Sequence, residues 1–388
     1  MSKIINVRIP NTLIGLGSIN KIGDIVKDLS PSKILIVTDP IIKKIGLINS
    51  VNSLLKKAGY VFDVYDECES NASVKSVERL VRRIRAGKYD LLIGIGGGSV
   101  LDSTKVASLV AANQGLNIYD LLDGKTATKA IAKILIPTTA GTGSEWSTVG
   151  MVSNDRAGGQ KKAITSAKNV PEAVIIDPEL TINLPQKLTA DTGMDALVHA
   201  IEAYTSSNAN VFSDMFALTA LELISQNILQ AYSKGTQNID ARYNMSVGAS
   251  IAMYAVAVSG VGIAHFMGHP LEKRVHVSHG ISCTLMLPYV MEFNLIACPE
   301  KFARIAEVMG ESVDGLSVFD AAAKAVEAVR ILSKALGMPQ TLSDIGIKKT
   351  QVAEMAEEML DGYGLEIRMW NPRDVSVEDT TKIYIAAI

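Results

Sequence analysis

Histidines are the residues of this chain whose type and spacing most directly suggest chemistry. Four of the five lie in one short stretch that begins at His265 and ends at His279. The fifth, His199, follows Asp195 by four positions in an uninterrupted helical pattern, and this spacing places both side chains on one helix face. Imidazole nitrogens and a carboxylate are ligands that zinc and ferrous iron accept. Satisfied core or capping histidines are the alternative, but the clustering favours a metal site.

A glycine-rich turn provides a second chemical signal. Gly96-Gly97-Gly98-Ser99 lies between a buried strand at 90–95 and a helix that carries Asp102. A backbone without Cβ atoms can turn sharply and approach a ligand, while a helix N-terminus offers free N–H groups to an anion. The turn is therefore a plausible pyrophosphate site, with a merely tight turn as the alternative. It is not the Rossmann fingerprint, because the acidic candidate, Asp39, precedes the glycines.

A polar loop follows the next predicted strand. The segment 137–145 reads Pro-Thr-Thr-Ala-Gly-Thr-Gly-Ser-Glu, in which hydroxyls and glycines could surround a phosphate or a nicotinamide amide. An ordinary Ser/Thr-rich loop is the alternative. Both polar loops come at the carboxyl ends of buried strands, where open α/β sheets bind their ligands. The two loops together predict a nucleotide site.

The elements that must position these residues change character along the chain. Continuous apolar runs predict strands that alternate with helices expected at 20–29, 45–58 and 74–86, a pattern typical of a parallel sheet covered on both faces. The predicted strands lie at 33–37, 60–65, 90–95, 132–137 and 173–177. Segments 7–10 and 12–17 suggest an opening hairpin. From 187 onward the periodicity is helical, so we expect an α/β domain at 1–182 and an all-helical domain at 183–388.

Composition narrows the class of protein. A chain of 388 residues with 48% hydrophobic and 20% charged residues can build a large core and is not disordered. A net charge of −2 without a basic block makes nucleic acid an unexpected partner. Three separated cysteines and no signal peptide fit a cytoplasmic protein. The charge-free segment 245–264 is long enough to cross a bilayer, but we expect one buried helix that delivers His265, and no membrane association.

Five motifs resemble the iron-containing (type III) alcohol dehydrogenase family and together span the chain. They are Gly96-Gly-Gly-Ser-Val-Leu-Asp102, the loop 137–145, Gly193-Met-Asp-Ala-Leu-Val-His-Ala-Ile-Glu-Ala-Tyr204, His265-x3-His269-Pro-x8-His279-Gly280 and Asn371-Pro-Arg373. The resemblance implies a dinucleotide-binding α/β domain, an all-α metal-binding domain with a dehydroquinate synthase-like architecture, and an active site in the cleft between them.

The resemblance also implies residue roles. The metal ligands would be Asp195, His199, His265 and His279, with His269 beside the metal as a catalytic group. Spacing alone would instead pair His265 with His269, but a proline at 270 disfavours helical geometry at the preceding residue. Asp39 would hold the adenosine ribose. The other implied cofactor contacts are Asn71, Gly97, Gly98, Ser99, Asp102, Thr138, Thr139, Thr142, Ser144 and Lys162.

The implied activity is NAD-dependent interconversion of a small alcohol and its aldehyde or ketone, with Fe²⁺ or alternatively Zn²⁺ as Lewis acid, NADP less favoured, and a homodimer or higher homo-oligomer as the assembly. A zinc-dependent glycerol or polyol dehydrogenase, a metallohydrolase and a catalytically silent NAD-binding protein are alternatives. The sequence departs from the family pattern at 70–73, at Trp146, and at Glu272-Lys273-Arg274, where small residues are usual. These departures leave the implied metal and cofactor residues unchanged, so they bear on which substrate the protein takes.

Overall fold

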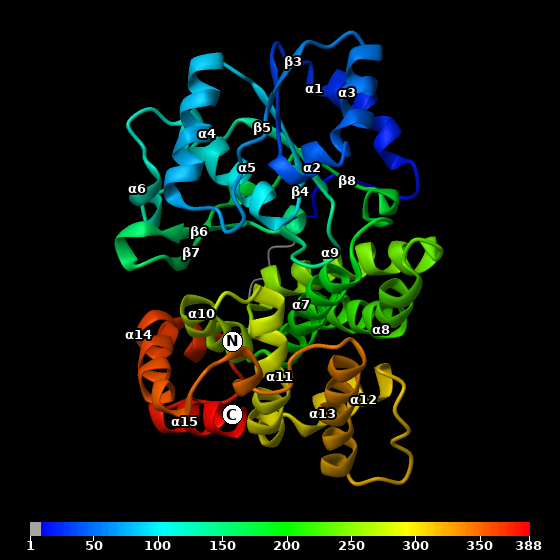
Figure 1. The fold of residues 1–388 in the computed structure, drawn as a ribbon, viewed down its shortest axis with the longest axis vertical. Coiled ribbons are helices and arrows are strands. Elements are labelled where there is room, and N and C mark those ends of the chain that lie inside the picture. Colours follow the sequence, from blue (N-terminus) through cyan, green and yellow to red (C-terminus); the bar gives the residue numbers. More distant parts are fainter. Residues whose placement is uncertain (1–8) are drawn as a thin grey trace. The chain divides into compact units, whose positions relative to one another are not determined.

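The structure is a computed structural model that describes residues 9–388, and it divides into two compact units (Figure 1). The described part of the first unit ends at Asn183, and the second comprises Leu184–Ile388. Each unit is considered by itself below.

A fully parallel six-stranded sheet forms the centre of the first unit, which confirms the predicted α/β class. The strand order is β1-β8-β5-β4-β2-β3. Because neighbouring strands are parallel, the chain must cross over the sheet between one strand and the next. The strands are β1 Thr12–Ile14, β2 Ile34–Val37, β3 Phe62–Tyr65, β4 Leu91–Gly96, β5 Ala132–Pro137 and β8 Ala173–Ile176.

The first segment of the predicted opening hairpin, 7–10, lies partly outside the described residues, so the hairpin stays a prediction. Residues 7 and 8 lie outside the described part, and β1 pairs in parallel with β8, with Leu13 opposite Ile175. Proline has no N–H for a ladder, which removes one donor just before β1 at Pro10. After β1 the backbone turns at Gly17, whose φ is +70°, and enters a short 3-10 helix.

Helices cover both faces of the sheet, as the apolar runs predict. Alternate side chains of one strand enter different cores: Ile34 and Ile36 belong to one cluster, and Leu35 to the other. The first cluster contains residues of α1 and α3, and the second contains residues of α4 and α5. The helices of this unit are α1 Ile22–Leu29, α2 Pro40–Lys44, α3 Ile48–Lys57, α4 Val74–Gly87, α5 Gly98–Ala112 and α6 Ile118–Leu122.

An antiparallel hairpin, which the sequence analysis did not identify, lies outside the main sheet. It consists of β6 Val149–Asn154 and β7 Gln160–Thr165, joined through Gly158 and Gly159, both with positive φ. Only Val152 and Ile164 on these strands are buried apolar residues of the adjoining core. With so few inward-facing side chains, the alternation of apolar and polar residues is too short to stand out.

The second unit is helical throughout its regular elements. Its helices are α7 Gln186–Thr205, α8 Val211–Lys234, α9 Ile239–Ser259, α10 Ile263–Arg274, α11 His279–Asn294, α12 Pro299–Val308, α13 Val318–Ala335, α14 Val352–Trp370 and α15 Val377–Ala386. Helices α7, α8 and α9 pack together, and α10 packs against α11 and α14.

The expected single helix over 245–264 is wrong, because α9 and α10 meet at a bend of 106°. Gly260 has φ +84°, and a Cβ atom built there would lie 2.3 Å from the ring of Trp370. The chain therefore leaves α9 at this glycine and starts α10 with His265 in its first turn. Among the described residues, only His279–Ala297 is a straight helical stretch long and apolar enough to cross a membrane, and 61% of its apolar window is buried.

Helix α10 continues through Pro270, contrary to the expectation that this proline would disturb helical geometry at His269. Proline removes one hydrogen bond and crowds the preceding turn. Here neighbouring carbonyls find other donors: the Tyr384 hydroxyl donates to the Met267 carbonyl at 2.7 Å, and Arg274 donates to the Pro270 carbonyl at 3.1 Å. Helical spacing therefore holds from His265 past His269.

Candidate active site

Three helices of the second unit bring the predicted ligands together. Asp195 and His199 lie one turn apart on α7, and both are buried. His265 is buried in the first turn of α10, and His279 is the first residue of α11. Helix α7 packs against both α10 and α11, so the apolar faces of these helices place the four side chains in one region.

Their ligand atoms converge on Asp195. Its Oδ1 lies 4.0 Å from Nε2 of His265 and 4.0 Å from Nε2 of His279. Potential ligand atoms of these three residues and of Cys283 all lie within 4.8 Å of one another. His199 is not in that set, but its ring stacks on the His265 ring with centroids 4.5 Å apart.

Cys283 shares the cluster without the geometry of a ligand. Its Sγ is 3.7 Å from both Nδ1 and Nε2 of His279, so the sulfur does not lie along the Nε2 lone pair. Complete burial raises the pKa of the Cys283 thiol well above its usual value, and neighbouring carboxylates such as Asp195 raise it further. A buried neutral thiol of this kind is a packing residue.

Glu202 is a site residue that the sequence analysis missed. Its Oε2 lies 2.5 Å from Nδ1 of His265, and its Oε1 accepts a hydrogen bond from the Ala264 N–H at 2.6 Å. One carboxylate thus orients the ring and binds the N-terminus of α10. The available signal was its spacing, since Glu202 follows His199 by three positions and shares its helix face.

The electrostatics fit a divalent cation. Burial lowers the pKa of His199 to about 3, so this ring is neutral, and its buried Nδ1 has no hydrogen-bond partner among residues 9–388. Burial opposes charge on His265, but the Glu202 carboxylate outweighs it and raises the pKa of that imidazole. Nε2 of His265 also has no hydrogen-bond partner within the described chain. Imidazole nitrogens without a hydrogen-bond partner beside a buried carboxylate are the donor set of zinc and ferrous sites.

His269 lies beside this cluster. Its ring stacks on His279 with centroids 5.4 Å apart and an interplanar angle of 15°, and it contacts Tyr363 on its other side. It does not belong to the set that converges on Asp195. His269 therefore lies next to the candidate ligands but outside the group around Asp195, even though its spacing from His265 puts both residues on one face of α10. His276, which matched no family position, is exposed.

In the first unit, the predicted cofactor residues gather at the carboxyl ends of β2, β4 and β5. The Thr138 N–H donates to the Gly96 carbonyl at 3.0 Å, which joins the two polar loops. A Cβ atom on Gly98 would lie 2.8 Å from the Thr142 side chain, and Gly97 faces Thr139. Only glycine allows the helix N-terminus to approach this loop so closely.

Helix α5 begins at this junction in the manner of an anion site. Gly97 is its N-cap and supplies no side-chain cap, which leaves first-turn N–H groups available to a ligand. The Asn71 N–H donates to Ser99 Oγ at 3.1 Å, so the loop before α4 also reaches the glycine turn. The buried Thr138 hydroxyl has no hydrogen-bond partner within residues 9–388. These features fit a bound pyrophosphate.

The remaining predicted contacts have defined places. Ser144 donates to Oδ1 of Asp102 at 2.6 Å, so these two residues bind each other across the junction. Lys162 lies in the middle of β7, opposite Val152. Asp39 caps α2: its Oδ1 accepts from the N–H groups of Ile41 and Ile42 at 2.8 and 2.9 Å. Asp39 therefore has a structural role as an N-cap, and this role uses only one of its two carboxylate oxygens.

Lys105 is a second residue that the sequence analysis missed. It is fully buried, lies 3.0 Å from Oδ1 of Asp102, and donates to the Ser144 carbonyl at 2.8 Å and to Ser147 Oγ at 3.2 Å. It also donates to the Val149 carbonyl. Burial lowers the pKa of Lys105, and the Asp102 carboxylate opposes that shift. The ammonium group thus links α5, the polar loop and β6.

We expect Lys105→Met to lower the free energy of unfolding of the first unit by about 3–5 kcal/mol, because it leaves a partly buried carboxylate and several carbonyls without their cation. Urea unfolding at neutral pH measures the loss, and the exposed Lys129→Met is the control. Equal unfolding midpoints for the two variants would contradict the structural role of Lys105.

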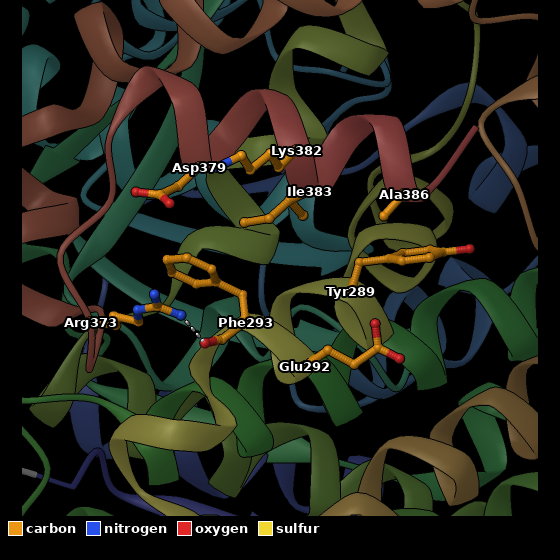
Figure 2. A pocket seen from close by; sticks show the side chains of 8 residues that line it. All are labelled: Tyr289, Glu292, Phe293, Arg373, Asp379, Lys382, Ile383 and Ala386. Atoms are coloured by element: carbon orange, nitrogen blue, oxygen red, sulfur yellow. Dashed lines mark hydrogen bonds between the residues drawn. The ribbon is translucent and has the colours of Figure 1, made fainter.

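The closing Asn371-Pro372-Arg373 motif has a structural place. Asn371 and Asn294 exchange side-chain hydrogen bonds at 2.9 Å, and Arg373 donates to the Phe293 carbonyl at 2.8 Å while its guanidinium lies over the Phe293 ring (Figure 2). These contacts connect the end of α14 to α11, and Arg373 lines a pocket of about 400 Å³ between α11 and α15. The motif thus fixes the C-terminal end of α11, the helix that begins with His279.

Comparison with known proteins agrees with this geometry. The family model for iron-containing alcohol dehydrogenases matches residues 10–178. The family model for the C-terminal part of the Fe-containing alcohol dehydrogenases matches residues 189–388. The chain is 35% identical to long-chain-alcohol dehydrogenase 1 of Geobacillus thermodenitrificans (strain NG80-2), with 97% of this chain and 95% of the relative covered. It is 36% identical to the 1,3-propanediol dehydrogenase of Klebsiella pneumoniae, with 97% of each covered.

Solved structures show the same likeness. A 1,3-propanediol oxidoreductase matches with a TM-score of 0.94 and 34% identity over 100% of both chains. An alcohol dehydrogenase from Oenococcus oeni matches with a TM-score of 0.94 and 35% identity, covering 99% of this chain and 100% of that one. The fold and the relatives define an oxidoreductase of the alcohol dehydrogenase class. The chain belongs to the iron-containing alcohol dehydrogenase family.

Proposed function

We propose that this protein is an NAD-dependent alcohol dehydrogenase that uses a divalent metal, Fe²⁺ in preference to Zn²⁺, to interconvert a small alcohol and its aldehyde or ketone. The observation that carries the proposal is the convergence of two imidazole Nε2 atoms on Oδ1 of Asp195, each at 4.0 Å. Asp195, His199, His265 and His279 would hold the metal. When bound, a divalent ion supplies Lewis-acid polarisation of an alcohol or carbonyl oxygen.

The residues of the chain would divide the remaining tasks. The glycine turn and the N-terminus of α5 would bind the pyrophosphate of the cofactor, and the loop that contains Thr138, Thr139 and Thr142 would fix the nicotinamide. His269, which stacks on His279, would be the acid or base that exchanges a proton during the reaction. A cytoplasmic homodimer or larger homo-oligomer is part of the proposal.

Two features favour this proposal over the alternatives. A metallohydrolase would use similar ligands but would not need a glycine turn at the end of a parallel strand. A silent nucleotide-binding protein would not need a buried carboxylate facing two imidazoles, which is costly to maintain without a cation. A polyol dehydrogenase with zinc differs only in substrate and metal. Relatives are named for 1,3-propanediol and for lactaldehyde, so small alcohols and aldehydes are the first substrates to test.

The test is metal analysis of anaerobically purified protein, followed by assays of alcohols and aldehydes with NAD and NADP. We expect close to one divalent ion per chain and NAD-coupled turnover of at least one small alcohol or aldehyde. A protein that holds metal but hydrolyses esters or amides without turning over any alcohol would favour the hydrolase alternative. Zinc in place of iron, with glycerol as the best substrate, would favour the polyol dehydrogenase.

The choice of cofactor follows from Asp39. One carboxylate oxygen caps α2, and we propose that the other accepts hydrogen bonds from the adenosine ribose of NAD. The 2′-phosphate of NADP would meet a like charge there, a contact that costs several kcal/mol at an interface. We therefore expect kcat/KM for NAD to exceed that for NADP by more than about tenfold, since each 1.4 kcal/mol is a factor of ten.

Two variants separate the charge of Asp39 from its capping role. Asp39→Asn keeps a good N-cap but loses the charge, whereas Asp39→Gly loses both the side-chain cap and the charge. We expect both variants to shift the ratio of kcat/KM toward NADP, and Asp39→Asn to retain the thermal stability of the unmutated protein more fully. Equal kcat/KM for the two cofactors in the unmutated enzyme would refute this role.

A further inference from the structure

Glu272 lies on the same face of α10 as two of the site histidines. His265, His269 and Glu272 have the spacing i, i+4 and i+7, which aligns side chains along one side of a helix. The Glu272 side chain is only 13% exposed. A carboxylate of such low exposure next to a candidate metal site requires a partner.

That partner is His279. Oε1 of Glu272 lies 2.6 Å from Nδ1 of His279, and the same oxygen accepts a hydrogen bond from the Ser282 hydroxyl at 3.0 Å. The nearest nitrogen of His269 is farther away, with Nδ1 at 3.8 Å. Helix α10 thus supplies the carboxylate and α11 supplies the imidazole and the hydroxyl that fixes the carboxylate.

We infer that Glu272 is a positioning residue that fixes the tautomer and ring orientation of His279 for metal binding. A carboxylate only accepts hydrogen bonds, so the proton of a neutral His279 ring lies on Nδ1 and the lone pair on Nε2. Nε2 is the atom that lies 4.0 Å from Oδ1 of Asp195. The inference rests on the proposed function, because it assigns the role of Glu272 toward the metal proposed there.

The same arrangement occurs at the other histidine that faces Asp195. Glu202 approaches Nδ1 of His265 at 2.5 Å, and Nε2 of that ring also lies 4.0 Å from the Asp195 oxygen. Two carboxylates from different helices therefore turn two imidazoles toward one point. Hydrogen bonds of this kind from metal-binding histidines to carboxylates fix the ring and raise its basicity.

His279 needs this support more than His265 does. Its side chain is 27% exposed, against 7% for His265, and it begins α11, so no earlier turn of its own helix holds the ring. Its backbone is fixed, because a Cβ atom on Gly280 would lie 2.1 Å from the Asp191 carbonyl oxygen. The hydrogen bond to Glu272 and the stack with His269 then determine where the ring points.

The first test is zinc retention by the full-length protein against a chromophoric chelator. We expect Glu272→Ala to weaken zinc binding by roughly 10–100-fold. Glu272→Gln keeps an acceptor oxygen and should lose clearly less. Glu358→Gln is the control, because Glu358 pairs with Lys273 and Arg274 of the same helix without touching a histidine in this structure. Equal zinc retention in Glu272→Ala and Glu358→Gln would overturn the inference.

The second test reports the tautomer without metal or turnover. Long-range ¹H–¹⁵N spectra of metal-free, ¹⁵N-histidine-labelled protein should show the His279 proton on Nδ1, and Glu272→Ala should mix or reverse the tautomers. A proton on Nε2 of His279 in the unmutated chain would refute the inference. If the unmutated chain binds neither Fe²⁺ nor Zn²⁺, the proposed function fails, and the imidazole spectrum still decides the role of Glu272.

Discussion

Replacement of His279 by alanine is expected to remove most of the bound metal and, with it, the dehydrogenase activity. His279 places Nε2 4.0 Å from Oδ1 of Asp195, and none of the neighbouring side chains can replace it. Burial raises the pKa of the Cys283 thiol, whose sulfur does not lie along the Nε2 lone pair, and Nδ1 of His269 lies 3.8 Å from Oε1 of Glu272. The loss in metal affinity should exceed the roughly 10–100-fold effect of removing a partner of a metal-bound histidine. His265→Ala should behave in the same way.

Metal content by elemental analysis and nucleotide binding by calorimetry measure the outcome separately. The proposed cofactor residues belong to the first unit, so we expect nucleotide affinity to be retained while metal is lost. His276→Ala is the matched control, because His276 is exposed three positions before His279. Stoichiometric metal and near-normal turnover in His279→Ala would exclude it as a ligand.

Replacement of His269 by alanine should leave the metal in place and reduce turnover by roughly one to four decades, the range expected for loss of a positioned acid or base. The structure separates the two histidines of α10. His265 faces Asp195 and is oriented by Glu202, whereas His269 stacks on the His279 ring. Metal analysis and kcat of the same preparation measure the two effects.

A glutamine variant tests the chemical reason for that loss. Glutamine at 269 can donate and accept hydrogen bonds but cannot carry a proton at neutral pH. We therefore expect His269→Gln to be as slow as His269→Ala, with metal content unchanged in both. If metal is lost from both variants, His269 is a ligand, as its four-residue spacing from His265 would suggest on its own.

Much of the fold was predictable, because its determinants are local. Continuous apolar runs identified β2, β4, β5 and β8 within a residue or two, and β5 at its observed bounds. The errors occurred where distant residues decide the geometry. The end of α9 depends on the packing of Trp370 against Gly260. No local pattern contains that information.

The sequence by itself determined which side chains could do chemistry: the Asp-x3-His pair, the clustered histidines and the glycine turn between a strand and a helix. Types and helical spacings are local properties, and they suffice to suggest a metal and a nucleotide. Only the tertiary structure decided which atoms face each other. Glu202 acts on His265 across 63 positions, and Glu272 reaches His279 from another helix. Hydrogen bonds act over about 3 Å, so these roles exist only once helix packing has brought the groups within that distance.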